Sequence, residues 1–153
     1  MLRSTSLGSL WANYIKPIVQ RPPGLQVGAL CHREGDNGRE VLLISSSSGR
    51  WILPKGWPID GKTAGEAAQQ EAWEEAGIKK SHVSKEAVGS FLTEKHFNDG
   101  RVMPCEQKVF SVAVSKVSDE FPEAHRRKRI WVSPEKAAEL VDEDGLKSLL
   151  HTL

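Results

Sequence analysis

Two short apolar runs with β-branched residues, at positions 25–32 and 40–45, are separated by a polar stretch rich in Gly, Asp and Asn. Runs of this length that are bounded by turn-forming residues are typical of paired strands. We therefore predict a β-hairpin. A serine-glycine loop over residues 45–49 follows it, and then a third short strand, residues 51–53, that ends at Pro54.

A helical pattern starts at Thr63. Thr63 and Glu66 have the spacing of a capping box, and Gly77 suits the left-handed turn with which many helices end. The pattern predicts a helix over residues 63–77. Small side chains on its inner side would let a neighbouring loop approach closely: Ala64, Ala67, Ala68 and Ala72.

Strand-like segments return in the second half of the chain. The segments 86–97 and 102–117 flank Asn98-Asp99-Gly100, and a turn of this composition is a strong hairpin signal. A last short strand is expected at 129–132.

Helical signals close the chain. Ser133-Pro134-Glu135 supplies an N-cap, a proline at the first helical position and an acid in the first turn, which predicts a helix through about Leu140. Residues 145–150 are expected to add a helical turn or two. The order of the elements predicts an α+β fold, an α/β/α sandwich in which a mixed β-sheet lies between helices.

Length and charge narrow the class of protein. A chain of 153 residues fits one domain, which we place at residues 24–153 after an N-terminal extension, residues 1–23. The formal charge of +1 gives no overall attraction to nucleic acid or acidic lipid, and no apolar run is long enough to cross a bilayer. Two cysteines far apart in sequence, Cys31 and Cys105, fit reduced thiols and hence a cytoplasmic protein.

The extension has two interpretations. It contains no acid and carries Arg3, Lys16 and Arg21 among serines and apolar residues, which is typical of an organelle-targeting presequence. The alternative, which we favour, is a segment that packs its apolar side chains on the domain before Pro22-Pro23 interrupts it.

Three carboxylates of the predicted helix, Glu71, Glu74 and Glu75, are spaced i, i+3 and i+4 and therefore share one side of it. Like charges at this spacing repel one another. A solvated acidic surface is one explanation, and a bound cation among them is the other. Carboxylate oxygens suit Mg²⁺, which is commonly bound by one or two carboxylates together with substrate phosphates.

The sequence around these acids resembles the Nudix box, G-x5-E-x7-R-E-U-x-E-E-x-G-U, where U is a bulky apolar residue. Three positions differ from that pattern: Lys62 stands in place of Glu, Gln70 in place of Arg, and Ala72 in place of a larger residue. The positions that match are Gly56, Glu71, Glu74, Glu75, Gly77 and Ile78.

The resemblance implies a Nudix fold, a hydrolase, and Mg²⁺ as the cofactor, with Mn²⁺ as a substitute. It implies that Glu71, Glu74, Glu75 and the backbone carbonyl of Lys55 bind the metal, and that Glu74 or Glu71 acts as the catalytic base. Gly56 and Gly77 would be structural. One of three later acids is expected to supply a further metal ligand, and the sequence does not indicate which one: Glu106, Glu120 or Glu123.

Basic residues beside aromatic ones, at positions 50–56 and 125–131, suggest where substrate binds. Together with the serine loop they resemble the branch of the family that hydrolyses diphosphoinositol polyphosphates and diadenosine polyphosphates. The alternative for the second cluster is a solvated edge of a loop and strand. Trp57 is the best candidate to stack on a nucleobase. By resemblance, the substrate-binding residues are Arg50, Lys55, Ser46, Ser47, Ser48 and Arg127.

These features predict an Mg²⁺-dependent hydrolase that cleaves a phosphoanhydride bond in a diphosphate linked to another group. The expected partner is a small phosphorylated molecule, and diadenosine polyphosphates and diphosphoinositol polyphosphates are the favoured candidates. We expect no binding to a membrane. A pyrophosphohydrolase acting on nucleoside triphosphates or on RNA 5′ ends is the enzymatic alternative and is not favoured. A binding module without turnover is the alternative of a different class. The sequence does not indicate an oligomeric state.

Overall fold

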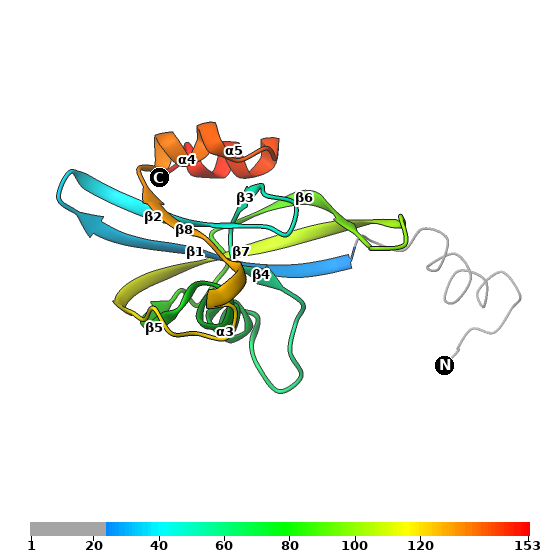
Figure 1. Ribbon diagram of the computed structural model, residues 1–153, viewed down its shortest axis with the longest axis horizontal. Coiled ribbons are helices and arrows are strands. Elements are labelled where there is room, and N and C mark those ends of the chain that lie inside the picture. The colour runs from blue at the N-terminus through cyan, green and yellow to red at the C-terminus, as the bar shows by residue number, and fades with distance from the viewer. Residues whose placement is uncertain (1–23) are drawn as a thin grey trace, which may run out of the picture.

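Eight strands form one mixed sheet with helices on both faces, as the computed structural model shows (Figure 1). The structure describes residues 24–153, so both interpretations of the extension, residues 1–23, lie outside the described residues. The strands are β1 (Gly24–Gly35), β2 (Gly38–Ser45), β3 (Trp51–Ile52), β4 (Lys55–Gly56), β5 (Ile78–Val83), β6 (Gly89–His96), β7 (Val102–Val117) and β8 (Arg129–Val132).

The helices are α3 (Ala64–Ala76), α4 (Pro134–Leu140) and α5 (Asp144–Leu150), with a short 3-10 turn, η2, at Ala124–Arg126. Their predicted caps are confirmed. The Thr63 hydroxyl accepts from the backbone N–H of Glu66, the Glu66 carboxylate accepts from that of Thr63, and Gly77 adopts the left-handed conformation, φ +72°. In this part of the chain no helix is both long enough and apolar enough to cross a bilayer.

The long strand β1 runs through the centre of the sheet. It pairs in parallel with β7 and antiparallel with β2 and β4. Alternate residues of β1 point to opposite faces. Val27 and Ala29 pack with alanines of α3, and Leu30 packs with residues of α4 and α5. The predicted sandwich, a mixed sheet between helices, is therefore confirmed (Figure 1).

Small side chains let α3 lie close to the sheet. Its inward residues Ala67, Ala68, Ala72 and Ala76 are all fully buried. Only methyl groups separate the helix backbone from the strands at these positions. The close packing places the carboxylates of α3 next to β4 and the loop that precedes the helix.

The sequence interpretation missed β4 and β5 and began β6 too early. β5 follows the helix cap directly at Ile78 and pairs with β7, although its sequence is mostly polar and its Lys79 and Lys80 are exposed. An edge strand of this kind is stabilised by backbone hydrogen bonds to its neighbour and has no clear apolar alternation. The predicted start of β6 at Glu86 is wrong, because the strand begins at Gly89.

Candidate active site

Glu75 is the most buried of the three predicted acids, with 8% of its surface exposed. Its Oε1 accepts a hydrogen bond from the backbone N–H of Lys55 at 3.1 Å. Its Oε2 lies 3.3 Å from Nη2 of Arg127. A buried carboxylate is tolerated only where donors and positive charge surround it, and these two contacts supply both. Glu75 therefore connects α3 to β4 and to the segment before β8.

Glu71 lies against Gly56. A Cβ built on Gly56 would come within 2.7 Å of Oε1 of Glu71, so a larger residue at this position would collide with the carboxylate. The glycine is required here for space and not for an unusual backbone angle, since its φ is not positive. Among residues 24–153, no basic side chain forms a hydrogen bond or ion pair with Glu71.

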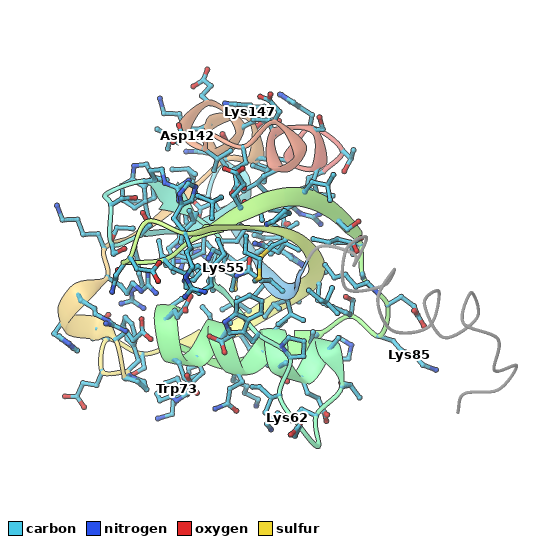
Figure 2. All side chains as sticks on the ribbon, turned by 90° about the vertical axis from the view of Figure 1, so that its right-hand side faces the viewer. Lys55, Lys62, Trp73, Lys85, Asp142 and Lys147 are labelled. Carbon is cyan, nitrogen blue, oxygen red and sulfur yellow. The ribbon has the colours of Figure 1, made fainter. Side chains whose placement is uncertain are left out.

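Glu74 is oriented by Gln70, whose side-chain Nε2 donates a hydrogen bond to Oε2 of Glu74 at 2.5 Å. Gln70 stands at a position where the Nudix box has Arg, so a neutral amide here holds the neighbouring carboxylate. Figure 2 shows Lys62, the other charge substitution, in the loop on the far side of α3 from Lys55. Trp73 lies on the side of α3 that points away from the sheet.

Glu123 joins the acidic cluster from the loop before β8. Its backbone N–H donates to the carbonyl of Glu74 at 3.0 Å, and its Oε1 lies 2.9 Å from Nε of Arg127. Of the three later acids that the sequence offered as a further metal ligand, Glu123 is the one whose contacts join it to α3. Glu106 lies on β7, and Glu120 is exposed, with its backbone bonded to Ser118.

Arg127 is held by three acceptors. Besides Glu75 and Glu123, its Nη1 donates to the carbonyl oxygen of Ser45 at 2.8 Å, and only 14% of its side chain is exposed. The sequence assigned Arg127 to substrate. The structure gives it contacts within the protein that position two carboxylates, and a contact with substrate remains a prediction.

Arg129 has a role that the sequence did not indicate. Its Nη1 donates to the carbonyls of Ala76 and Ser118 at 2.9 and 3.0 Å, and its Nη2 pairs with Asp119 at 2.7 Å. It therefore caps the C-terminus of α3, where cations are favourable. The last turn of α3 contains no basic residue of its own, so Arg129, distant in sequence, supplies the positive charge at this helix end. No local pattern could have revealed the contact.

The serine loop lies beside the same basic segment. Ser45 bonds to Lys128 through its backbone N–H and its hydroxyl, at 3.0 and 2.9 Å. Farther along the loop, Ser46 and Ser48 share a hydrogen bond of 3.0 Å, and Nε of Arg50 donates to the Ser48 hydroxyl at 3.2 Å. Ser47, Ser48 and Arg50 are exposed. The serine loop and the segment around Arg127 are thus joined by hydrogen bonds. Binding of phosphate by these two segments remains a prediction.

Burial and charge repulsion shift the pKa values of the site. Burial, followed by the neighbouring charges of Glu75 and Glu74, raises the pKa of Glu71 to about 7. Burial also raises the pKa of Glu75, although the Lys55 N–H and Arg127 oppose it. Burial and the nearby Lys95 lower the pKa of Lys55, which Figure 2 shows between α3 and the C-terminal helices.

The acids suit a hard cation in the chemistry of their donor atoms. All are oxygen ligands, Glu71 and Glu75 are partly or wholly buried, and Gly56 leaves the Glu71 carboxylate uncovered by a side chain. Within residues 24–153 no group of three or more such side chains converges into a preformed metal cage.

Comparison with known proteins places these features in context. Residues 22–153 match the family model described as NUDIX domain. Nudix hydrolase 16, mitochondrial, of Arabidopsis thaliana is 31% identical over 115 residues, 72% of this chain and 63% of that protein. The chain thus spans less than two thirds of the length of this relative.

Two further proteins are similar. Diphosphoinositol polyphosphate phosphohydrolase 3-beta of Bos taurus is 30% identical over 120 residues, 76% of this chain and 68% of that protein. Among solved structures, the Ap4A hydrolase of C. elegans has a TM-score of 0.60 at 21% identity, covering 85% of this chain and 95% of that one. The last likeness is one of fold alone.

Proposed function

Because the chain belongs to the Nudix family, we propose that it is an Mg²⁺-dependent hydrolase that cleaves a phosphoanhydride bond in a diphosphate linked to another group. Diadenosine polyphosphates and diphosphoinositol polyphosphates are the first substrates to test. The name of a similar protein, a diphosphoinositol polyphosphate phosphohydrolase, supports this choice.

The observation that carries the proposal is the state of Glu71. Its half-buried carboxylate lies next to Glu74 and Glu75 and has no basic partner among the described residues. Arg127 compensates Glu75, and Gln70 donates to Glu74, so the negative charge of Glu71 is the one left without compensation. Burial, and after it the repulsion from Glu75 and Glu74, raises the pKa of Glu71, and a divalent cation at this place would favour the charged carboxylate against both.

Glu71, Glu74, Glu75 and the carbonyl of Lys55 would hold the metal. When bound, Mg²⁺ neutralises charge on the diphosphate oxygens and makes water more acidic. The chain's own residues then orient the reactants and accept a proton. Glu74, whose carboxylate is fixed by Gln70, takes the proton of the attacking water, and Glu71 is the alternative acceptor.

The test is product release from a panel of substrates with and without Mg²⁺. The panel contains diadenosine tetraphosphate, a diphosphoinositol polyphosphate, a nucleotide sugar, a nucleoside triphosphate and a 5′-triphosphorylated RNA. We expect hydrolysis of one of the first two, and a fall in kcat of roughly 10²- to 10⁴-fold in Glu74→Gln. Glu66→Gln, which changes the helix cap and not the cluster, is the matched control.

Two outcomes would contradict the proposal. Tight binding of one compound without turnover of any would identify a binding module. Hydrolysis confined to the nucleoside triphosphate or the RNA would identify the other enzymatic class. Titration of Mg²⁺ by calorimetry gives an independent check, because Glu71→Gln should weaken metal binding whichever substrate is cleaved.

The compartment is a separate proposal. The name of the Arabidopsis relative includes "mitochondrial". This name supports the interpretation of residues 1–23 as an organelle-targeting presequence, which is the alternative to a cytoplasmic location. Fusion of these residues to a fluorescent protein distinguishes them. Import of the fusion into an organelle would contradict a cytoplasmic location.

A further inference from the structure

The helix α3 covers only part of the sheet face on which it lies. Its cover includes Val27 of β1 and Phe110 of β7, which belong to one apolar cluster with the alanines of the helix. Figure 1 shows the start of β1 and the β6–β7 hairpin extending beyond α3. In this region no helix of residues 24–153 lies over the α3 side of the sheet.

The strand register identifies the side chains of this uncovered region. Leu25 of β1 is opposite Glu106 of β7, and Glu106 is opposite Leu92 of β6. Residues opposite each other point to the same face, and so do alternate residues of one strand. Because Phe110 points towards α3, every second residue of β7 back to Val102 belongs to that side. We call the following set the open face: Leu25, Leu92, Glu94, Val102, Pro104 and Glu106.

Apolar side chains are exposed on the open face. Leu92 is 73% exposed, Val102 is 49% exposed and Leu25 is 37% exposed. They are three of the six large apolar side chains that are exposed among residues 24–153. Apolar side chains scattered singly over a surface are ordinary, but a group of them on one face indicates a surface that another segment covers.

Two acids lie among these apolar side chains. Glu106 is only partly exposed, lies between two of the leucines in the register, and forms no ion pair with another described residue. Glu94 lies 3.4 Å from Nε2 of His96. Lys108, two residues along β7 from Glu106, is exposed and also has no ion-pair partner in this part of the chain. The open face therefore suits a segment that is both apolar and basic.

The chain itself contains such a segment. Residues 1–23 include no acid and three basic residues, Arg3, Lys16 and Arg21. Positions 10–19 are rich in large apolar side chains: Leu10, Trp11, Tyr14, Ile15, Ile18 and Val19. The segment thus complements the open face in polarity and in charge.

This segment joins the sheet beside the open face. It ends at Pro23, and Gly24, the first residue of β1, is paired with Cys105, the neighbour of Glu106. Prolines lack the N–H that a continued strand would need, so Pro22-Pro23 disfavours an extension of β1. The open face measures about 13 Å along the strands and about 10 Å across three strands, and four residues in extended form cover its length. The 21 residues before the proline pair are more than enough to reach all of it.

A second copy of the chain is the weaker candidate for this surface. The open face has an area on the order of 10² Å², whereas a stable interface between two proteins buries about 800 Å² on each partner. A segment of the same chain does not have to meet that requirement. Its short connection to the sheet keeps it at an effective concentration in the millimolar range.

We infer that residues 1–21 fold back within the same chain and cover the open face, with their apolar side chains on Leu25, Leu92 and Val102 and a basic residue beside Glu106. The inference assigns a surface to the packing interpretation of the extension. It does not rest on the proposed function, because the open face lies outside the acidic cluster of α3. It makes the extension part of the folded domain and not a presequence that is removed.

A photo-cross-linker identifies what covers Leu92. The full-length chain carries p-benzoylphenylalanine in place of Leu92, is irradiated, and is mapped by peptide mass spectrometry. We expect a monomeric product in which position 92 is joined to residues 1–21. A product joined to a second chain, or the absence of any product with the extension, would overturn the inference. The matched control has the cross-linker at Leu153, which is 41% exposed after α5, and should give no product with the extension.

Proteolysis measures how firmly the segment is docked. Thermolysin cleaves before large apolar residues, and its rate within residues 1–21 follows the fraction of molecules in which the segment is released. Leu92→Asp should increase this rate about tenfold relative to the wild-type full-length chain, because it places a charge where apolar contacts are expected. Leu153→Asp, the matched control, should leave the rate unchanged.

Two results of this assay would contradict the docking. One is an equal cleavage rate in the wild type and in Leu92→Asp. The other is a wild-type rate as fast as that of a synthetic peptide with the sequence of residues 1–23. If the aspartate variant does not fold, Leu92→Thr serves as the second variant, because threonine is favourable in a strand, and a smaller increase of about threefold is expected.

Glu106→Lys tests the charge contact independently. It places a like charge beside the basic segment, so cleavage within residues 1–21 should become about three- to tenfold faster, with a smaller difference at high salt. Lys16→Glu together with Arg21→Glu should restore slow cleavage in this variant. Glu86→Lys, at an exposed acid between β5 and β6, is the matched control. Equal rates for the two lysine variants would overturn the charge part of the inference.

Discussion

The guanidinium of Arg127 lies 3.3 Å from the carboxylate of Glu75, and only 14% and 10% of the two side chains are exposed. The pair joins the segment before β8 to the acidic face of α3. Arg127 also bonds to Glu123 and to the carbonyl of Ser45. One side chain thus fixes the relative positions of the serine loop, α3 and the loop that carries Glu123.

Removal of Arg127 should destabilise the protein strongly. Arg127→Ala leaves Glu75 buried without its partner, for which we expect a loss of about 3 kcal/mol in the free energy of unfolding, measured by urea denaturation. Glu75→Gln combined with Arg127→Ala should lose less than the sum of the single changes. Additive losses would show that the two groups are not coupled. Arg126→Ala, at an exposed neighbour, should cost less than about 0.5 kcal/mol.

The contact between Gly56 and Glu71 gives a second prediction. Gly56→Ala places a methyl group against the Glu71 carboxylate, so Mg²⁺ affinity measured by calorimetry should fall by about tenfold or more. Glu71→Asp shortens the side chain and makes room. If the collision is the cause, Gly56→Ala should have a smaller further effect in the Glu71→Asp background than in the wild type.

The stability of the metal-free protein should depend on Glu71 and pH. Because its pKa is raised to about 7 in the folded state, folding favours the protonated form. The resulting stability is fully present below the unfolded pKa of about 4.5 and is lost as pH rises towards 7. Glu71→Gln removes this dependence and should therefore gain stability relative to wild type between pH 4 and pH 8.

We expect that gain to be about 1–2 kcal/mol, since solvent screens part of the penalty at a half-buried group. Thermal unfolding of both proteins in a chelator at the two pH values measures it. Saturating Mg²⁺ at pH 8 should stabilise the wild type more than the variant. A constant difference between the two proteins across this range would exclude a raised pKa at Glu71.

Arg129 should matter for stability and not for substrate. Arg129→Met keeps the length of the side chain but removes the cap on Ala76 and the pair with Asp119. We expect a loss of about 1–2 kcal/mol in the free energy of unfolding, with KM unchanged. A raised KM with unaltered stability would instead place Arg129 among the substrate-binding residues. Lys128→Met, at its exposed neighbour, is the control.

Local sequence was informative where neighbours along the chain make the structure. The helix α3 begins with the capping box at Thr63 and ends at a left-handed Gly77, as its pattern predicted, because these bonds join residues three to four apart. The spacing of Glu71, Glu74 and Glu75 likewise followed from the helical period alone. The hairpin strands β1 and β2 extend beyond their predicted limits and turn at the expected polar stretch.

Contacts between residues distant in sequence could not be predicted from local sequence patterns. The basic segment 126–129 is uniform in composition, yet Arg126 is exposed, Arg127 holds two carboxylates and Arg129 caps a helix. Their roles depend on which groups of α3 and β2 come within reach after folding. The choice of Glu123 over Glu106 and Glu120 as the acid beside α3 depends on the same packing.

By itself the sequence determined the acidic helix, its glycine loop and the family, because each is encoded by residues a few positions apart. Only the tertiary structure decided which arginine compensates which acid and that the carbonyl oxygen of Gln107 is buried without a donor. Those outcomes arise when burial removes water from groups distant in the chain, so that each charge and each amide must find its partner in space or remain without one.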